Sequence, residues 1–398
     1  MRKFFYVLFA VLVFSVSAQA NPYGGADEQT AKVLKKVDDY VKQEKYLSAW
    51  LSCVGVNEYI IAKKTELCCK YFAFSFMHKS FSFKDLENGE TLMSVRSDSA
   101  SQSLLMFLWN PVEICEKYLK THEPSPVLDY ALGLYFNDVG KRYSGRWDIG
   151  DDEIFDKMVL YWRKAFDNGI YSSELLSEMG LAYLKTADYK NSRLMYSKME
   201  ELSLNYSADD SYNYALVNAY LKDYDTAIVY MKKAIKLYDK MTQFQYDAYS
   251  ACADFYMKKK DYEGALKILS QGRKIYKDDY MIELKCIRAC ALGNDKKNTL
   301  KFADSFFALG AEAPAASNMI IQEFFNDGVK DWLSEFFDEQ IKKYKKQPMV
   351  LQNLYFAYTK YYLNCGERVK AAEWAGKAKA QFKENGTLTP EIEKMLDL

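Results

Sequence analysis

The chain has 398 residues, and its 54 Lys and Arg residues equal its 54 Asp and Glu residues, so the formal net charge is zero. This balance excludes the strongly basic surface that nucleic-acid binding requires. Aromatic residues make up 16% of the chain, which is more than a disordered chain carries and is enough to build a sizeable core.

The first 20 residues have the pattern of a secretory signal peptide. Met1-Arg2-Lys3 supply positive charge, an apolar stretch runs from Phe4 to Ala18, and Ala18-Gln19-Ala20 is a small-x-small cleavage site. The apolar stretch is shorter than the ~20 residues that a membrane-spanning helix needs, so an uncleaved anchor is the less favoured alternative. We expect cleavage before Asn21, export to a periplasm or the cell exterior, and no membrane span in the mature chain.

Residues 21–128 are predicted to form divergent helical repeats. Residues 27–56 follow the repeat template described below only loosely, and residues 83–102 are polar enough to predict a long loop. No β-sheet is expected anywhere in the mature chain. The chain has only two histidines, of which His78 is expected on a helix face and His122 at a helix C-terminus.

Residues 129–169 are similar to a Sel-like repeat, because YALGLY from Tyr130 pairs with YWRKAFDNG from Tyr161. An enlarged loop between Asn137 and Glu153 separates the two segments. Its acidic cluster could in principle bind Ca²⁺, but the spacing does not match a calcium loop, and helix N-capping by Asp151 or Asp152 explains it more simply. The cluster consists of Asp148, Asp151, Asp152 and Glu153.

Between residues 170 and 310 the sequence repeats itself. The segment DYDTAIVYMKKAIKLY from Asp223 returns as DYEGALKILSQGRKIY from Asp261, 38 residues later. The shared template is a Tyr, a small residue nine positions later, and a small or apolar residue seven positions after that. The copies are Tyr183, Ser192 and Met199; Tyr220, Ala227 and Ala234, with two residues lost from the turn; Tyr256, Ala265 and Gly272; and Tyr362, Ala371 and Ala378.

This spacing predicts two short antiparallel amphipathic helices in each copy, with small residues where the helix axes come closest. An acidic residue four positions before each first small residue is expected to begin the second helix, where free N–H groups favour it. A single pair cannot bury its apolar stripe, so the pairs must stack. A coiled coil is disfavoured, because these helices are too short for a sustained seam. The acids are Asp188, Asp223, Asp261 and Glu367.

At these residues the sequence resembles the tetratricopeptide repeat family, most strongly over residues 172–276 and 352–382. The resemblance implies an all-α fold, a right-handed α-α superhelical solenoid of stacked helix-turn-helix repeats whose first helices form a concave binding face. The predicted organisation is a signal peptide (1–20), divergent N-terminal helical repeats (21–128), a Sel-like repeat with an enlarged loop (129–169), tetratricopeptide repeats (170–310) and C-terminal helical or tetratricopeptide repeats (311–398).

The sequence contains no phosphate-binding loop, no metalloprotease motif and no nucleophile motif, so we expect no enzymatic activity and no cofactor. The eight cysteines lack metal-ligand spacing, so we expect no metal site and favour buried, unpaired thiols, with one or two disulfides as the alternative. Cys252 and Cys286 lie at matching positions of successive first helices, whose axes are about 8–10 Å apart and too distant for a disulfide.

We therefore predict an exported, non-enzymatic scaffold that binds a protein or peptide partner. A module that binds cell-envelope glycan through exposed tyrosines is the alternative, and an enzyme that uses scattered carboxylates is less favoured. Three lysines at one repeat position suggest a row that contacts acidic groups, although lysine is also an ordinary solvated residue. The candidate partner-binding residues are Lys185, Tyr214, Asn218, Lys222, Asp254, Met257 and Lys258.

Overall fold

The structure is a computed structural model that describes residues 21–98 and 105–398. The chain divides into two compact units, residues 1–205 (unit 1) and residues 206–398 (unit 2). The expected signal peptide lies outside the described residues. Among the helices of the described ranges, none has the length and apolar character needed to cross a membrane.

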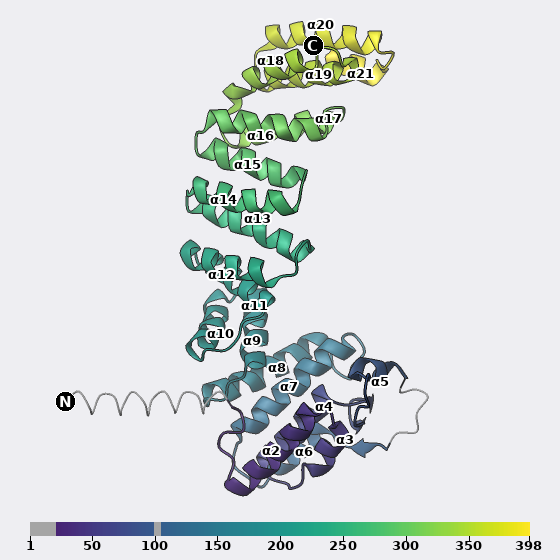
Figure 1. Cartoon of the computed structure of the whole chain (residues 1–398), viewed down its shortest axis with the longest axis vertical. Helices are drawn as coiled ribbons and strands as arrows, with labels where there is room; N and C mark the ends of the chain where they lie inside the picture. The colour runs from purple at the N-terminus through teal and green to yellow at the C-terminus, as the bar shows by residue number, and fades with distance from the viewer. Residues whose placement is uncertain (1–20, 99–104) are drawn as a thin grey trace, which may run out of the picture. The chain divides into compact units, whose positions relative to one another are not determined.

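Unit 1 is mainly helical, and most of its helices pack against a neighbour in the sequence (Figure 1). The pairs α2–α3, α7–α8 and α9–α10 are of this kind, and α4 packs on α7 as well. The helices are α2 (Glu28–Lys42), α3 (Tyr46–Ser52), α4 (Glu58–Lys70), α5 (Leu92–Asp98), α6 (Pro111–Leu119), α7 (Pro126–Tyr143), α8 (Asp151–Asp167), α9 (Ser173–Lys185) and α10 (Tyr189–Glu201).

Unit 1 also contains a small antiparallel sheet, so the expectation of no sheet was wrong. Strands β1 (Phe74–Phe76), β2 (Ser80–Ser82) and β3 (Phe107–Leu108) pair in the order β1-β2-β3. Phe and Ser alternate along β1 and β2, which fits strands with one face inward. The predicted polar loop at 83–102 is also partly wrong, because α5 begins inside it at Leu92.

Unit 2 is a stack of helix pairs, which confirms the predicted solenoid of helical repeats (Figure 1). Each helix pair packs on the next pair along the chain, and α21 (Pro390–Leu396) packs on the last helix of the stack, α20 (Arg368–Glu384). The pairs are α11 (Ala208–Tyr220) with α12 (Tyr224–Leu237), α13 (Gln243–Lys258) with α14 (Tyr262–Ile275), α15 (Tyr280–Leu292) with α16 (Lys296–Leu309), α17 (Pro314–Asn326) with α18 (Leu333–Lys343) after the 3-10 turn η2 (Lys330–Trp332), and α19 (Pro348–Asn364) with α20 (Arg368–Glu384).

The turns at Asp188, Asp223, Asp261 and Glu367 share one design. The acidic residue predicted to begin the second helix is its N-cap, and the side chains of Asp188, Asp223 and Asp261 accept a bond from the N–H three residues later. The N–H of each N-cap in turn donates to the carbonyl five residues earlier, as from Asp261 to Tyr256. The residue before the N-cap has a positive φ, 63° at Lys222 for example.

This geometry corrects the register of one repeat. Asp223 donates to the carbonyl of Asn218, so Asn218 and not Tyr220 occupies the repeat's Tyr position. The turn in this copy has therefore lost no residues. Ala227, which follows Asn218 by nine positions, is fully buried between the helices like its counterpart Ala265.

Candidate functional site

The first helices of unit 2 pack side by side, α13 on α15, α15 on α17 and α17 on α19, and expose a common row of polar side chains. In each of these helices one residue of the row lies two positions before the repeat's Tyr position. Lys258 and Lys285 belong to the row as well and lie one helical turn from such a residue. Charged side chains on neighbouring helices meet across it, as Lys285 Nζ lies 2.6 Å from Asp254 Oδ1. We call this row the first-helix face; it consists of Asp254, Lys258, Lys285, Arg288, Gln322 and Lys360.

The first-helix face is hollowed between α17 and α19. A pocket of about 330 Å³ lies there, bordered by Gln322 and Lys360 and by the amides of Asn318, Asn326 and Asn364. Lys360 Nζ is 3.5 Å from Asn318 Oδ1 across this pocket. The pocket thus presents amides and one ammonium group, which can donate hydrogen bonds to a peptide backbone or carboxylate.

Two of the four cationic groups of this face already have a carboxylate partner. Lys285 pairs with Asp254, and Arg288 Nε lies 3.7 Å from Asp327 Oδ1. In the part of the chain that the structure describes, neither Lys258 nor Lys360 has a carboxylate at ion-pair distance. These two lysines are therefore the charges that a partner can neutralise.

Three of the residues predicted to bind a partner are buried in the helix stack. Tyr214 is 4% exposed, Asn218 is 0% exposed, and Met257 is 8% exposed. Asn218 donates its amide to the carbonyl of Tyr214 at 2.8 Å, and Tyr214 packs edge-on against Tyr230. These side chains hold the repeats together, so the structure removes them from the candidate surface.

The three lysines predicted to share one position do not do so. Lys185 and Lys258 each end the first helix of a pair, whereas Lys222 lies in a turn with positive φ. The corrected register makes Tyr220 the counterpart of Lys258. Lys222 instead corresponds to Lys260, which has a φ of 64°. All three predicted lysines are exposed.

Lys185 borders a pocket of about 420 Å³ in unit 1, formed by α7, α8 and α9. The loop beside this pocket is shorter than predicted, because α7 extends to Tyr143. Gly150, rather than an aspartate, is the N-cap of α8, since the aspartates lie in its first turn. Asp151 accepts hydrogen bonds from the Ser144 hydroxyl and the Gly145 N–H, which closes the loop.

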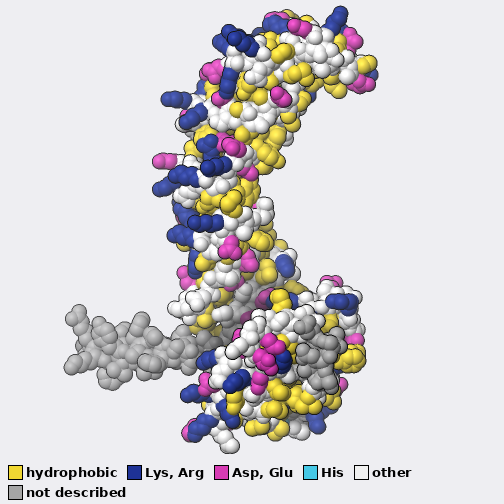
Figure 2. Space-filling model, turned by 45° about the vertical axis from the view of Figure 1, so that its right-hand side comes forward, with side chains coloured by type: hydrophobic (Ala, Val, Ile, Leu, Met, Phe, Trp, Pro, Cys, Tyr) yellow, Lys and Arg dark blue, Asp and Glu magenta, His cyan; other side chains and the backbone are white. Residues whose placement is uncertain are grey.

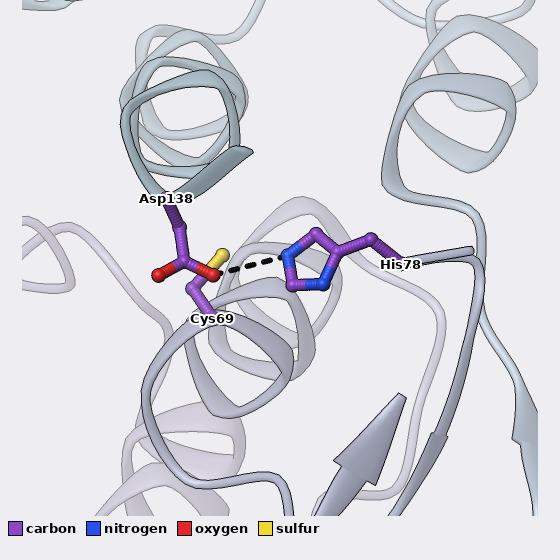
Figure 3. Close-up of side chains that lie close together, drawn as sticks. All are labelled: Cys69, His78 and Asp138. Atoms are coloured by element: carbon purple, nitrogen blue, oxygen red, sulfur yellow. Dashed lines mark ion pairs between the residues drawn. The ribbon is translucent and has the colours of Figure 1, made fainter. Parts of the chain in front are cut away.

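Unit 1 also brings together three side chains that the sequence spacing did not connect, Cys69, His78 and Asp138 (Figure 3). They come from α4, from the turn between β1 and β2, and from α7. One ligand atom from each lies within 4.8 Å of the others. His78 lies on a hairpin turn and not on a helix face, so that prediction was wrong.

The cysteines are free thiols, as predicted, and all except the half-buried Cys365 are buried. Burial raises the pKa of the thiols, to about 12 for Cys53, Cys115 and Cys252. A thiol with such a pKa stays protonated at neutral pH and is a poor nucleophile. Cys53, Cys115 and Cys252 therefore act as small apolar core residues.

The repeat tyrosines do not form an open aromatic surface. Tyr362 is buried, and Tyr183 and Tyr256 are half-buried. Of the tyrosines in the described ranges, only Tyr220 and Tyr280 are exposed. The groove of exposed tyrosines that the glycan-binding alternative requires is therefore absent from the described residues.

Comparison with known proteins supports the repeat assignment. The tetratricopeptide repeat family model matches residues 220–285, which span α12 to α14 and the start of α15. The match does not reach residues 129–169, so the Sel-like repeat stays a prediction. No curated protein matches the sequence.

Several solved structures of tetratricopeptide repeat proteins match parts of this chain. The C-terminal part of a TPR repeat-containing protein from Cytophaga hutchinsonii is 11% identical, with 67% of this chain and 100% of that chain covered and a TM-score of 0.40. A tetratricopeptide repeat protein from Parabacteroides merdae is 13% identical, with coverages of 62% and 92% and a TM-score of 0.35. YrrB, described as a TPR protein with an unusual peptide-binding site, is 13% identical, with coverages of 48% and 95% and a TM-score of 0.32.

Proposed function

We propose that this tetratricopeptide repeat protein is an exported, non-enzymatic scaffold that binds an acidic segment of a partner protein on the first-helix face of unit 2. The observation that carries the proposal is the row itself. Successive first helices expose charged or amide side chains at one repeat position, while the neighbouring positions are buried in the stack. A row of this kind can follow an extended peptide along the stack.

The charge of the row supports an acidic partner. Asp254 and Asp327 offset Lys285 and Arg288, which leaves Lys258 and Lys360 as the two cations without a carboxylate among the described residues. Lysine and arginine side chains also gather along one edge of unit 2 (Figure 2). The positive electrostatic potential of these side chains attracts acidic segments, and salt weakens the attraction.

The state of the cysteines is compatible with export. Disulfides form in oxidising compartments when accessible thiols meet, and thiolates are the reactive species. Seven of the eight cysteines are buried, and only Cys365 is half-buried and accessible to oxidation. N-terminal sequencing of the protein from its source cells tests export directly, since the proposal requires a mature chain that begins at Asn21.

Site-specific photo-crosslinking in the source cells tests the binding face. A photoreactive amino acid at position 258 should capture a partner, whereas the same group at position 274, an exposed lysine on the second helix α14, should not. Equal capture at both positions, or capture at 274 alone, would contradict the proposal.

The captured partner then allows a quantitative test. The Lys258→Glu/Lys360→Glu variant should bind it about tenfold or more weakly at low salt, and the difference should shrink as salt rises. The matched control reverses two exposed lysines on second helices, Lys236→Glu/Lys274→Glu, and should bind like the parent.

A further inference from the structure

We propose that Cys69, His78 and Asp138 form a binding site for a Zn²⁺ ion in unit 1. The three side chains offer a thiolate, an imidazole and a carboxylate, each of which is a common ligand of zinc in proteins. Their ligand atoms already lie within 4.8 Å of one another. In a tetrahedral site with ligand distances of about 2.0–2.3 Å, the ligand atoms would be roughly 3.3–3.8 Å apart, so small side-chain rotations suffice.

The buried polar atoms of this cluster lack the hydrogen bonds that such atoms normally make. His78 is 0% exposed, and neither of its ring nitrogens has a hydrogen-bond partner among the described residues. Asp138 Oδ2 likewise has none, although it lies 3.1 Å from His78 Nε2, because the angles do not suit a hydrogen bond. Buried polar groups are nearly always satisfied, and a metal ion would bind one ring nitrogen of His78 and Asp138 Oδ2 at once.

The backbone that carries His78 is itself unusual. Met77 and His78 have φ values of 47° and 49°. They are the two central residues of a β-turn that the Lys79 N–H closes on the Phe76 carbonyl, and Asn and Gly are the favoured residues at such positions. Left-handed backbone at two consecutive side-chain-bearing residues is unfavourable and points to a functional constraint. The turn places the imidazole inside the unit, opposite Asp138 (Figure 3).

Neighbouring groups hold the ligands in position. Arg142 Nε binds the other carboxylate oxygen, Asp138 Oδ1, at 2.8 Å, which leaves Oδ2 directed at the imidazole. The His78 ring stacks on Tyr135 with centroids 5.3 Å apart, and the Tyr135 hydroxyl donates to the His78 carbonyl at 3.2 Å. Supporting contacts of this kind orient the ligands in metal sites.

An entry route lies beside the cluster. A surface pocket of about 420 Å³ is bordered by Phe72, Arg142 and Tyr143. The same three residues contact the cluster from the other side, Arg142 through Asp138 and the two aromatic rings through His78. An ion that enters this pocket therefore needs to pass only one layer of side chains.

The arrangement does not suit cysteine catalysis. A nucleophilic cysteine and its orienting carboxylate occupy opposite nitrogens of the histidine ring. Here Cys69 and Asp138 lie on the same side of the imidazole, as a shared metal ion requires (Figure 3). Three protein ligands leave a fourth zinc position for a water molecule or another small ligand.

Titration of the metal-free full-length protein with Co²⁺ tests the site, because cobalt substitutes for zinc and reports its ligands by absorption. One equivalent should give visible bands of tetrahedral intensity and an ultraviolet thiolate-to-cobalt band, and Zn²⁺ should abolish both. Saturating Zn²⁺ should raise the melting temperature by about 5 °C, as expected for a ligand at about 100 times its Kd. Absence of the thiolate band from the parent protein would overturn the proposal.

Matched variants locate the site. Cys69→Ser and His78→Gln should lose the thiolate band and the zinc-induced rise in melting temperature. Cys115→Ser removes another buried thiol of unit 1, and His122→Ala removes the only other histidine, so both should bind like the parent. Loss of the signal in either control, or its retention in Cys69→Ser, would show that the metal binds elsewhere.

Discussion

A buried network of charges around Glu66 in α4 should make unit 1 sensitive to a single substitution. Glu66 Oε2 accepts from the Tyr23 hydroxyl at 2.7 Å and lies 2.9 Å from Lys63 Nζ. Lys63 Nζ also lies 2.6 Å from Asp38, and Glu66 Oε1 is 3.5 Å from Lys70 Nζ. The Lys63 and Glu66 side chains are only 6% and 13% exposed. Removal of the carboxylate charge would leave the buried Lys63 with Asp38 as its remaining partner.

The magnitude follows from the pKa of Glu66. Burial alone would raise this pKa, but Lys63, Lys70 and the Tyr23 hydroxyl outweigh burial and lower it from 4.5 to about 2. One pKa unit corresponds to about 1.4 kcal/mol, so the ionised carboxylate contributes about 3 kcal/mol to the free energy of unfolding at pH 7. Removal of one partner of a buried ion pair typically costs about 3–5 kcal/mol, which agrees.

The sign of the pH dependence is fixed by the lowered pKa. The folded protein holds the proton less tightly than the unfolded chain, so the stabilisation is complete above the unfolded pKa and is lost as the pH falls toward 2. We expect Glu66→Gln to lose about 3 kcal/mol at pH 7 and about 1.4 kcal/mol at pH 3. Urea unfolding at both pH values, combined with hydrogen exchange of the α4 amides, measures the loss in unit 1.

Glu28→Gln is the matched control. Glu28 pairs with Lys32 at 2.7 Å, but the two side chains are 86% and 75% exposed. Exposed pairs within a helix contribute about 0.3–0.5 kcal/mol, so this variant should lose no more. An equal loss at pH 7 and pH 3 in Glu66→Gln, or a loss similar to that of the control, would refute the reasoning.

Three further substitutions test other parts of the fold. Gly133→Ala should destabilise unit 1 by at least about 2 kcal/mol in urea unfolding, because the added Cβ would lie 2.2 Å from the fully buried ring of Trp162. Burial and a nearby carboxylate raise the pKa of Asp327 to about 6 although Arg288 opposes them. The unfolding free energy should therefore fall by about 2.4 kcal/mol between pH 4 and pH 7, and Asp327→Asn should abolish this fall. Lys222→Gly should raise the melting temperature slightly, because glycine adopts the φ of 63° without strain.

The repeat array could be predicted from the sequence because its signals are local. An acidic N-cap and a small residue four positions later define each second helix, and both are confirmed at Asp223 and Asp261. The spacing also contained the information that corrects the register. Each N-cap lies five positions after the repeat's Tyr position, and five positions before Asp223 stands Asn218. Tyr220, two positions later, matches the template by residue type but not by its distance from the N-cap.

The sheet of unit 1 was missed for a different reason. Alternating Phe and Ser before and after residues 77–79 is a strand signal, but the turn between them carries Met77 and His78 instead of Asn and Gly. Local turn chemistry therefore argued against a hairpin that tertiary packing stabilises. The aromatic rings that surround His78 include Phe72 before β1, Phe81 in β2 and Tyr135 in α7, so their contribution is not visible in any short segment.

The same limit explains why the Cys69, His78 and Asp138 cluster could not be read from spacing. Motif searches find ligands that one helix or loop brings together, whereas these three residues lie on a helix, a turn and a second helix up to 69 positions apart. Only the packing of α4 on α7 and the insertion of the hairpin turn bring them within reach of one ion. The strained turn then has a physical explanation. A hairpin with Asn-Gly at its tip would fold more readily but would carry no ligand, whereas the observed turn accepts an unfavourable backbone and delivers an imidazole to a carboxylate and a thiol.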